Sequence, residues 1–165
     1  MNPLTISGRD HAITQIPMLI RPATVADIPV LMALERHAST ASHWSLQQYE
    51  ALFSETDPKR IALVIEEEHT VKGFLVARAV EREWEIENVA VAGAARRRGL
   101  GTRLLGEFLD CVRGRGAESV FLEVRESNRA ARALYEKWAF VEAGRRNGYY
   151  REPEEDAVWY RLGFM

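Results

Sequence analysis

Three consecutive arginines precede a Gly-x-Gly in residues 96–105, RRRGLGTRLL, where the leucines begin an amphipathic pattern. Glycines at a helix start let a ligand approach the backbone, and the unpaired N–H groups of the first turn attract an anion. Two nucleotide motifs are excluded, because Leu104 stands where a dinucleotide fingerprint needs its third glycine and Glu107 stands where a P-loop needs lysine. The stretch therefore indicates either a pyrophosphate site or a solvated basic helix start.

Three further polar residues lie where they could do chemistry. Glu123 shares one face of a predicted strand, 118–124, with Phe121, opposite three apolar side chains. A carboxylate there is either a solvated strand charge or a general base. Asn128 and Tyr135 are seven residues apart, so their side chains leave the same face of a predicted helix. The tyrosine is either a core residue or a proton donor.

The composition limits the partners and the compartment. The chain has 22 Lys and Arg against 24 Asp and Glu, so it lacks the basic excess expected of a protein that binds nucleic acid directly. Its single cysteine excludes an intramolecular disulfide, and no apolar run is long enough for a membrane span, so we expect a cytoplasmic protein with no membrane partner. The four histidines show no metal-ligand spacing, which predicts no metal site. We expect a monomer or weak dimer.

The elements that would position these residues follow from periodicity. Residues 1–17 lack a pattern and are expected to form a flexible extension, whereas 18–165 are expected to form one domain. Short β-branched runs alternate with segments of helical spacing in the order β-α-α-β-β-β-α-β-α-β-β. This order predicts an α/β fold of the α+β kind, with a mixed, mostly antiparallel central sheet and helices on both faces. The expected strands are 18–24, 61–67, 72–81, 84–91, 118–124, 140–144 and 156–162.

Four segments taken in order resemble a known family. NVAVAGAARRRGLGTRLL is similar to the acetyl-CoA-binding motif [QR]-x-x-G-x-[GA] of the GNAT acetyltransferases, and LEVRESNRAARALYEKWAF resembles their second motif. The pair His43-Trp44 before a capped helix and the tail RRNGYYREPEEDAVWYRL narrow the resemblance to ribosomal-protein alanine N-acetyltransferases of RimI type. The match runs from 18 to 162. It departs from the pattern at Arg96, usually Gln, and at Trp159-Tyr160, where many relatives carry Val-Met.

The resemblance implies a GNAT-like fold, acetyl-CoA as cosubstrate and a role for each matching residue. Glu123 would be the proton acceptor, and Tyr135 would be the general acid that protonates the departing thiolate. The cofactor residues that it implies fall into three groups: Val89, Ala90 and Val91 for the pantetheine arm, Arg96, Arg97, Arg98, Gly99, Leu100, Gly101 and Thr102 for the diphosphate, and Asn128 as a further contact.

The acceptor is expected to be an amine. An α-amine, with a pKa near 7.7–8.0, is roughly one-tenth neutral at pH 7, whereas a lysine amine is about 0.04% neutral, so a single glutamate suits a peptide N-terminus better than a lysine. Trp44 would line the acceptor pocket or pack in the core, and Glu85 and Glu87 would be alternative bases or attract the cationic amine. Tyr149 and Tyr150 fall where related enzymes have a loop that covers the peptide.

Three functional hypotheses follow. The first is acetylation of the N-terminus of a polypeptide, in particular an alanine-initiated small-subunit ribosomal protein. The second is acetylation of a small-molecule amine, against which the tail RRNGYYREPEEDA argues. The third is a CoA-binding or ribosome-associated module without catalysis, against which the presence of Glu123 and Tyr135 argues.

Overall fold

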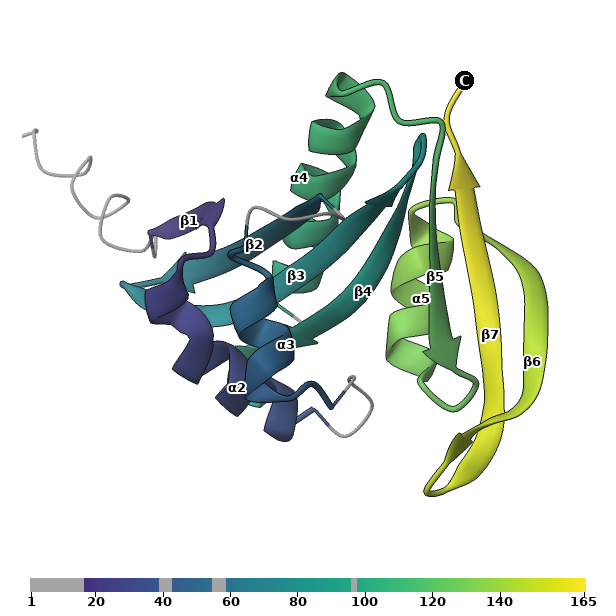
Figure 1. Ribbon diagram of the computed structural model, residues 1–165, viewed down its shortest axis with the longest axis horizontal. Helices are drawn as coiled ribbons and strands as arrows, with labels where there is room; N and C mark the ends of the chain where they lie inside the picture. The colour runs from purple at the N-terminus through teal and green to yellow at the C-terminus, as the bar shows by residue number, and fades with distance from the viewer. Residues whose placement is uncertain (1–16, 39–42, 55–58, 96–97) are drawn as a thin grey trace, which may run out of the picture.

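The computed structural model describes residues 17–38, 43–54, 59–95 and 98–165. Its centre is a seven-stranded sheet in the order β1-β2-β3-β4-β5-β7-β6 (Figure 1). Neighbouring strands are antiparallel except β4 and β5, which are parallel. The strands are β1 (Met18–Pro22), β2 (Arg60–Glu67), β3 (Thr70–Val80), β4 (Glu83–Val91), β5 (Ser119–Arg125), β6 (Val141–Arg151) and β7 (Glu154–Gly163).

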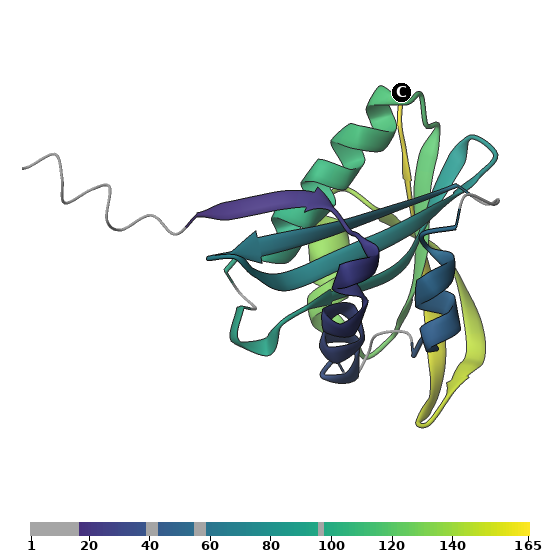
Figure 2. The ribbon, with the colours of Figure 1, turned by 60° about the vertical axis from the view of Figure 1, so that its left-hand side comes forward.

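Helices cover both faces of this sheet, as Figure 2 shows. One face carries α2 (Ile28–Arg36), which follows the short helix η2 (Val25–Asp27), and α3 (Leu46–Ala51). The other carries α4 (Leu100–Gly114), preceded by η3 (Gly93–Ala95), and α5 (Arg129–Lys137). The predicted order of elements and the mixed, mostly antiparallel sheet are therefore confirmed.

Side chains cap the first turns of two helices. Ser45 and Gln48 form a reciprocal capping box at α3, since the Ser45 hydroxyl accepts from the Gln48 N–H at 3.2 Å and the Gln48 side chain accepts from the Ser45 N–H at 2.8 Å. At α5, the Asn128 side chain accepts from the Ala131 N–H at 3.1 Å. Asn128 is thus the N-cap of the helix that carries Tyr135.

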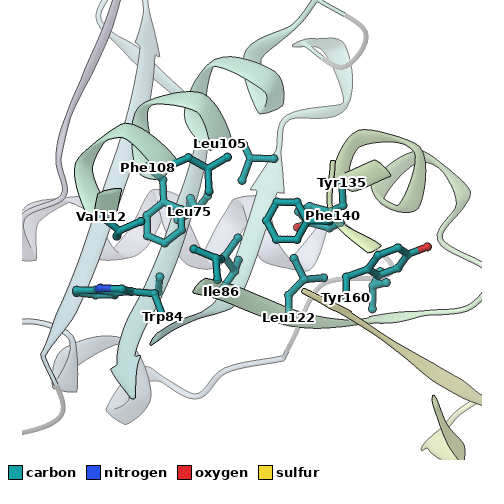
Figure 3. Close-up of a cluster of buried hydrophobic side chains, with 14 of the residues drawn as sticks. Leu75, Trp84, Ile86, Leu105, Phe108, Val112, Leu122, Tyr135, Phe140 and Tyr160 are labelled. Atoms are coloured by element: carbon teal, nitrogen blue, oxygen red, sulfur yellow. The ribbon is translucent and has the colours of Figure 1, made fainter. Parts of the chain in front are cut away.

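The largest core cluster lies between the sheet and the helices α4 and α5 (Figure 3). Phe108 of α4 packs edge-on against Trp84 of β4, with ring centroids 6.4 Å apart. Tyr135 of α5 packs against Phe140 at 5.5 Å and Tyr160 of β7 at 6.4 Å. Burial of these side chains holds α5 against the sheet, and Tyr135, the candidate general acid, is held there with it.

A β-bulge interrupts β4. Val76 of β3 pairs with Asn88 and Ala77 pairs with Ile86, so β4 has one additional residue, Glu87, at this point. The bulge changes the face of the sheet to which the even-numbered residues of β4 point. Before the bulge, Ile86 packs in the cluster with α4, whereas after it Ala90 packs in the cluster with α2.

The C-terminal hairpin differs from the sequence prediction. The expected strand 140–144 is the start of the longer β6, so Tyr149 and Tyr150 lie in a strand and not in a loop. Gly148, at φ +60°, lies within a register shift of β6 and donates its N–H to Asp156 Oδ1 at 2.9 Å. Pairing with β7 keeps the chain extended as far as Arg151.

Two other expectations concern the N-terminal residues and a membrane span. The proposed flexible extension, 1–17, lies outside the described residues except for Pro17. In the part of the chain that the structure describes, no helix is long and apolar enough to cross a membrane.

Candidate active site

Two cavities meet at Glu123. We call the larger, of about 670 Å³, the groove, and the smaller, of about 250 Å³, the inner cavity. Both are lined by Ile86, Glu87, Glu123 and Tyr150. The groove is also lined by Trp44, Arg78, Glu85, Phe121, Gly144, Arg145, Arg146, Tyr149 and Trp159, and the inner cavity by His43, Asn88, Val89, Leu122, Val124, Arg125, Asn128, Ala131, Leu134 and Tyr135.

The divergence of β4 and β5 accounts for the inner cavity. The two strands pair only over 83–85 with 119–121, and beyond that point residues of both strands line the cavity. The sequence-predicted residues Val89, Asn128 and Tyr135 come together here with Glu123. The Ala90 and Val91 side chains pack into other clusters, so these residues can offer a ligand only their backbone.

The predicted phosphate loop lies at the start of α4. Gly99 is the N-cap and has φ +79°, a left-handed conformation that favours glycine, and no side chain in the described part of the chain caps this helix. Leu100 is buried and anchors the first turn, whereas Gly99 is exposed. Of the three arginines, Arg96 and Arg97 lie outside the described residues, and Arg98 forms an ion pair with Glu67 of β2.

Glycine at position 101 has a packing role that the sequence did not reveal. A Cβ built on Gly101 would lie 3.6 Å from Leu134 Cδ2 and 3.8 Å from Val91 Cγ2. A side chain here would point towards α5 and β4, so a large residue would separate α4 from these elements. Thr102 is half-buried beside it.

Glu123 projects from β5 on the face that the alternation predicted. Its side chain is 23% exposed, and Oε1 lies 2.9 Å from Arg146 Nε of β6. The Arg146 side chain is 62% exposed, so the pair is open to solvent on one side. An incoming cationic amine would compete with Arg146 for the same carboxylate oxygens.

Tyr135 is buried, and burial raises its pKa above the ordinary value for tyrosine. The phenol therefore stays protonated at neutral pH, as a proton donor must. Its neighbour Tyr160 donates a hydrogen bond to Glu136 Oε1 at 2.8 Å and accepts one from Arg132 Nε at 3.0 Å. Because both partners belong to α5, the Tyr160 hydroxyl ties that helix to β7.

The other groove carboxylates are also paired with arginines. Glu85 Oε2 lies 3.2 Å from Arg78 Nη2, and Glu87 Oε1 lies 2.9 Å from Arg60 Nε. The groove thus has three carboxylates, each beside a guanidinium, when Glu123 is included. Such a wall can accept N–H donors from a peptide without presenting a large net charge.

Tyr149 and Tyr150 both line the groove, and Tyr150 also lines the inner cavity. Tyr150 is partly buried under the Arg125 guanidinium, which lies 4.2 Å from its ring centroid. Burial, and next the negative charge of Glu123, raise the pKa of Tyr150 to about 12. Tyr149 is about half exposed beside Arg146, 5.1 Å from its ring centroid.

Trp44 lines the groove, and a buried carboxylate holds its backbone. The Trp44 N–H donates to Glu35 Oε1 at 2.8 Å, and the Asn88 amide donates to the same oxygen at 3.1 Å. Glu35 and Asn88 are both buried. This network joins the segment before α3 to β4 beside the bulge, a contact that the sequence pattern did not reveal.

The groove also contains an aromatic pair that was not predicted from the sequence. Phe121 of β5 and Trp159 of β7 both line it, with ring centroids 5.9 Å apart. The departure from the family pattern at Trp159 was the available signal, but its consequence depends on β5 and β7 being neighbours. Among the described residues, no three or more His, Cys, Asp or Glu side chains are placed to hold a metal ion.

The fold is that of the N-acetyltransferases. A crystal structure titled the ribosomal-protein-S18-alanine N-acetyltransferase from Escherichia coli is similar with a TM-score of 0.79 and 30% identity, covering 89% of this chain and 94% of that one. A structure titled Ard1 from Thermoplasma volcanium is similar with a TM-score of 0.78 and 26% identity, covering 90% and 98%. The GNAT-like fold expected from the sequence is confirmed.

The family follows from the sequence matches. The model of the acetyltransferase (GNAT) family matches residues 29–140, and this chain belongs to that family of acetyltransferases. A protein of Salmonella typhimurium, named [ribosomal protein bS18]-alanine N-acetyltransferase, is 34% identical over 82% of this chain and 90% of its own length.

Proposed function

We propose that this enzyme transfers the acetyl group of acetyl-CoA to the N-terminal α-amine of a polypeptide. The observation that carries the proposal is the position of Glu123 where the groove and the inner cavity meet, with Tyr135 in the wall of the inner cavity. An acceptor in the groove and a thioester in the inner cavity would meet at this carboxylate.

The residues present fit the cosubstrate. The first-turn N–H groups of α4 begin after Gly99, whose left-handed backbone leaves the helix start accessible to an anion such as a diphosphate. Leu100, Gly101 and Thr102 would contribute N–H groups, with charge from Arg96 and Arg97. The pantetheine arm would run along the diverging edge of β4 at Val89, Ala90 and Val91, with Asn128 on the opposite side.

The chemistry requires two proton transfers. Glu123 would accept the proton from the acceptor amine, directly or through a water, as the new C–N bond forms. Tyr135 would donate its proton to the sulfur as the C–S bond breaks, and its raised pKa keeps that proton available. An α-amine, already partly neutral at pH 7, needs only a carboxylate base of this kind.

The acceptor is proposed to be an alanine-initiated small-subunit ribosomal protein, the substrate class named for the Salmonella and Escherichia coli relatives. Trp44, Glu85, Glu87, Tyr149 and Tyr150 would contact the peptide, since all five line the groove. Such a substrate would place the enzyme in the cytoplasm.

The test compares two peptides of one sequence. An alanine-initiated peptide and its N-terminally blocked, lysine-containing twin are incubated with acetyl-CoA, and the products are followed by mass spectrometry. We expect acetylation of the free N-terminus only. Equal modification of the blocked peptide would refute the N-terminal specificity, and modification of a polyamine but neither peptide would favour a small-amine acetyltransferase.

A further inference from the structure

Arg98 lies in the predicted diphosphate loop, but its guanidinium is already engaged. Nη1 lies 2.7 Å from Glu67 Oε1, and Nη2 bonds Glu67 Oε2, so the pair is bidentate. The Glu67 side chain is 7% exposed, whereas that of Arg98 is 43% exposed. The two residues are far apart in sequence and come together because β2 ends beside the start of α4.

The carboxylate has a fixed position. Glu67 is the last residue of β2 and pairs with Met18 of β1 and Thr70 of β3, so its backbone is held in the sheet from both sides. A buried carboxylate that loses its charged partner is strongly unfavourable, because the desolvation of the charge is no longer compensated. Release of Arg98 to a ligand would therefore leave Glu67 buried and unpaired.

The exposed residues before α4 need a contact that holds their backbone in place. Ala95 on one side and Leu100 on the other are buried, while Arg98 and Gly99 between them are exposed. Backbone N–H groups bind a diphosphate well only if the loop already has the right shape, since ordering a loop on binding costs free energy. A bidentate guanidinium pair fixes both distance and orientation.

We propose that Arg98 is a positioning residue, which holds the diphosphate loop in its binding conformation through Glu67 and does not itself contact the diphosphate. This inference rests on the proposed use of acetyl-CoA. It assigns a function in cosubstrate binding to Glu67, which lies on a different strand from the family motif.

The two roles of Arg98 predict opposite results for Glu67→Gln. If Arg98 positions the loop, the variant weakens acetyl-CoA binding, although it removes a negative charge near the loop. If Arg98 contacts the diphosphate, the variant frees the guanidinium, and affinity stays the same or improves. We expect the Kd from calorimetry to rise roughly ten- to a hundred-fold, the range for loss of one charge-assisted contact.

A mutant cycle sharpens the test. Arg98→Gln should weaken binding about as much as Glu67→Gln, and the double variant should be no worse than either single variant, because both break one contact. Glu66→Gln is the matched control: it removes the same charge one residue away, where the carboxylate pairs with Arg21 on β1. Its Kd for acetyl-CoA should remain that of the unmodified protein.

A shorter carboxylate separates geometry from charge and covers the case that Glu67→Gln fails to fold. Glu67→Asp keeps the charge but shortens the reach to Arg98, and it too should raise the Kd while the peptide KM at saturating acetyl-CoA is unchanged. Unchanged or tighter acetyl-CoA binding in a folded Glu67 variant would overturn the positioning role of Arg98 but not the proposed function. Absence of acetyl-CoA binding by the unmodified protein would overturn the proposed function and the inference with it.

Discussion

The inner cavity and the groove share Glu123 but are built in different ways. The inner cavity arises from the backbone, because β4 and β5 diverge after three paired positions. The groove is shaped by side chains, namely the aromatic pair of Phe121 and Trp159 and arginine–carboxylate pairs such as Arg146–Glu123. Divergent strands belong to the fold, whereas side-chain pairs change with single substitutions. The proposed cosubstrate side should therefore be common to the family, and the proposed acceptor side should be particular to this chain.

The largest effect is expected from Tyr135→Phe, which keeps the shape of the inner cavity but removes the proton. We expect kcat to fall roughly ten- to a thousand-fold with little change in acetyl-CoA affinity, as for loss of a positioned acid. Steady-state kinetics and calorimetry measure the two quantities. If acetyl-CoA affinity fell as much as kcat, Tyr135 would be a binding residue and not the general acid.

The pH profile adds a check on the same residue. Burial raises the pKa of Tyr135, so the phenol keeps its proton as pH rises through the range where ordinary tyrosine would begin to ionise. We therefore expect kcat of the unmodified enzyme not to fall between pH 7 and about 9.5, somewhat below the usual tyrosine pKa of about 10. A fall in kcat there that is absent from Tyr135→Phe would indicate a phenol of ordinary acidity.

Glu123→Gln removes the carboxylate of the proposed base, one of the four residues that line both cavities. The rate should fall about ten- to a hundred-fold near pH 7, where most of the α-amine is protonated, and recover in part above about pH 8 as the amine loses its proton unaided. The profile is measured with an alanine-initiated peptide. A loss that stays constant from pH 6 to 9 would mean that Glu123 binds the acceptor and does not take its proton.

Trp159→Val, which introduces a residue typical of many relatives, should act on the groove only. Loss of the aromatic contact with Phe121 is expected to change the peptide KM by roughly three- to ten-fold and to leave the Kd of acetyl-CoA unchanged. Trp159→Phe keeps an aromatic ring and serves as the control. If Trp159→Val altered acetyl-CoA binding instead, the two cavities would not be independent.

The smallest effect is expected from Arg146→Gln. The Arg146 side chain is largely exposed, and exposed ion pairs contribute little. The peptide KM should therefore fall by no more than about three-fold as competition for Glu123 is removed. Peptide kinetics at saturating acetyl-CoA measure this. A large loss of kcat would place Arg146 in the catalytic machinery.

Local patterns predicted much of this molecule because their causes are local. Ser45 and Gln48 satisfy the N–H groups of their own helix, and alternation along β5 places Glu123 opposite the apolar residues, whatever lies elsewhere in the chain. The extent of β6 was predicted wrongly, since pairing with β7 keeps 145–151 extended, and that pairing depends on a strand that follows later in the chain.

By itself the sequence determined the order of elements, the family and the residues Glu123, Tyr135 and Asn128 that line one cavity. Only the tertiary structure decided the partners of the charged groups: Arg98 with Glu67, Arg146 with Glu123, and the Tyr160 hydroxyl with Arg132 and Glu136. The physical reason is sequence distance. Periodicity and caps act within a few residues, whereas an ion pair depends on which strands and helices become neighbours when the whole sheet has formed.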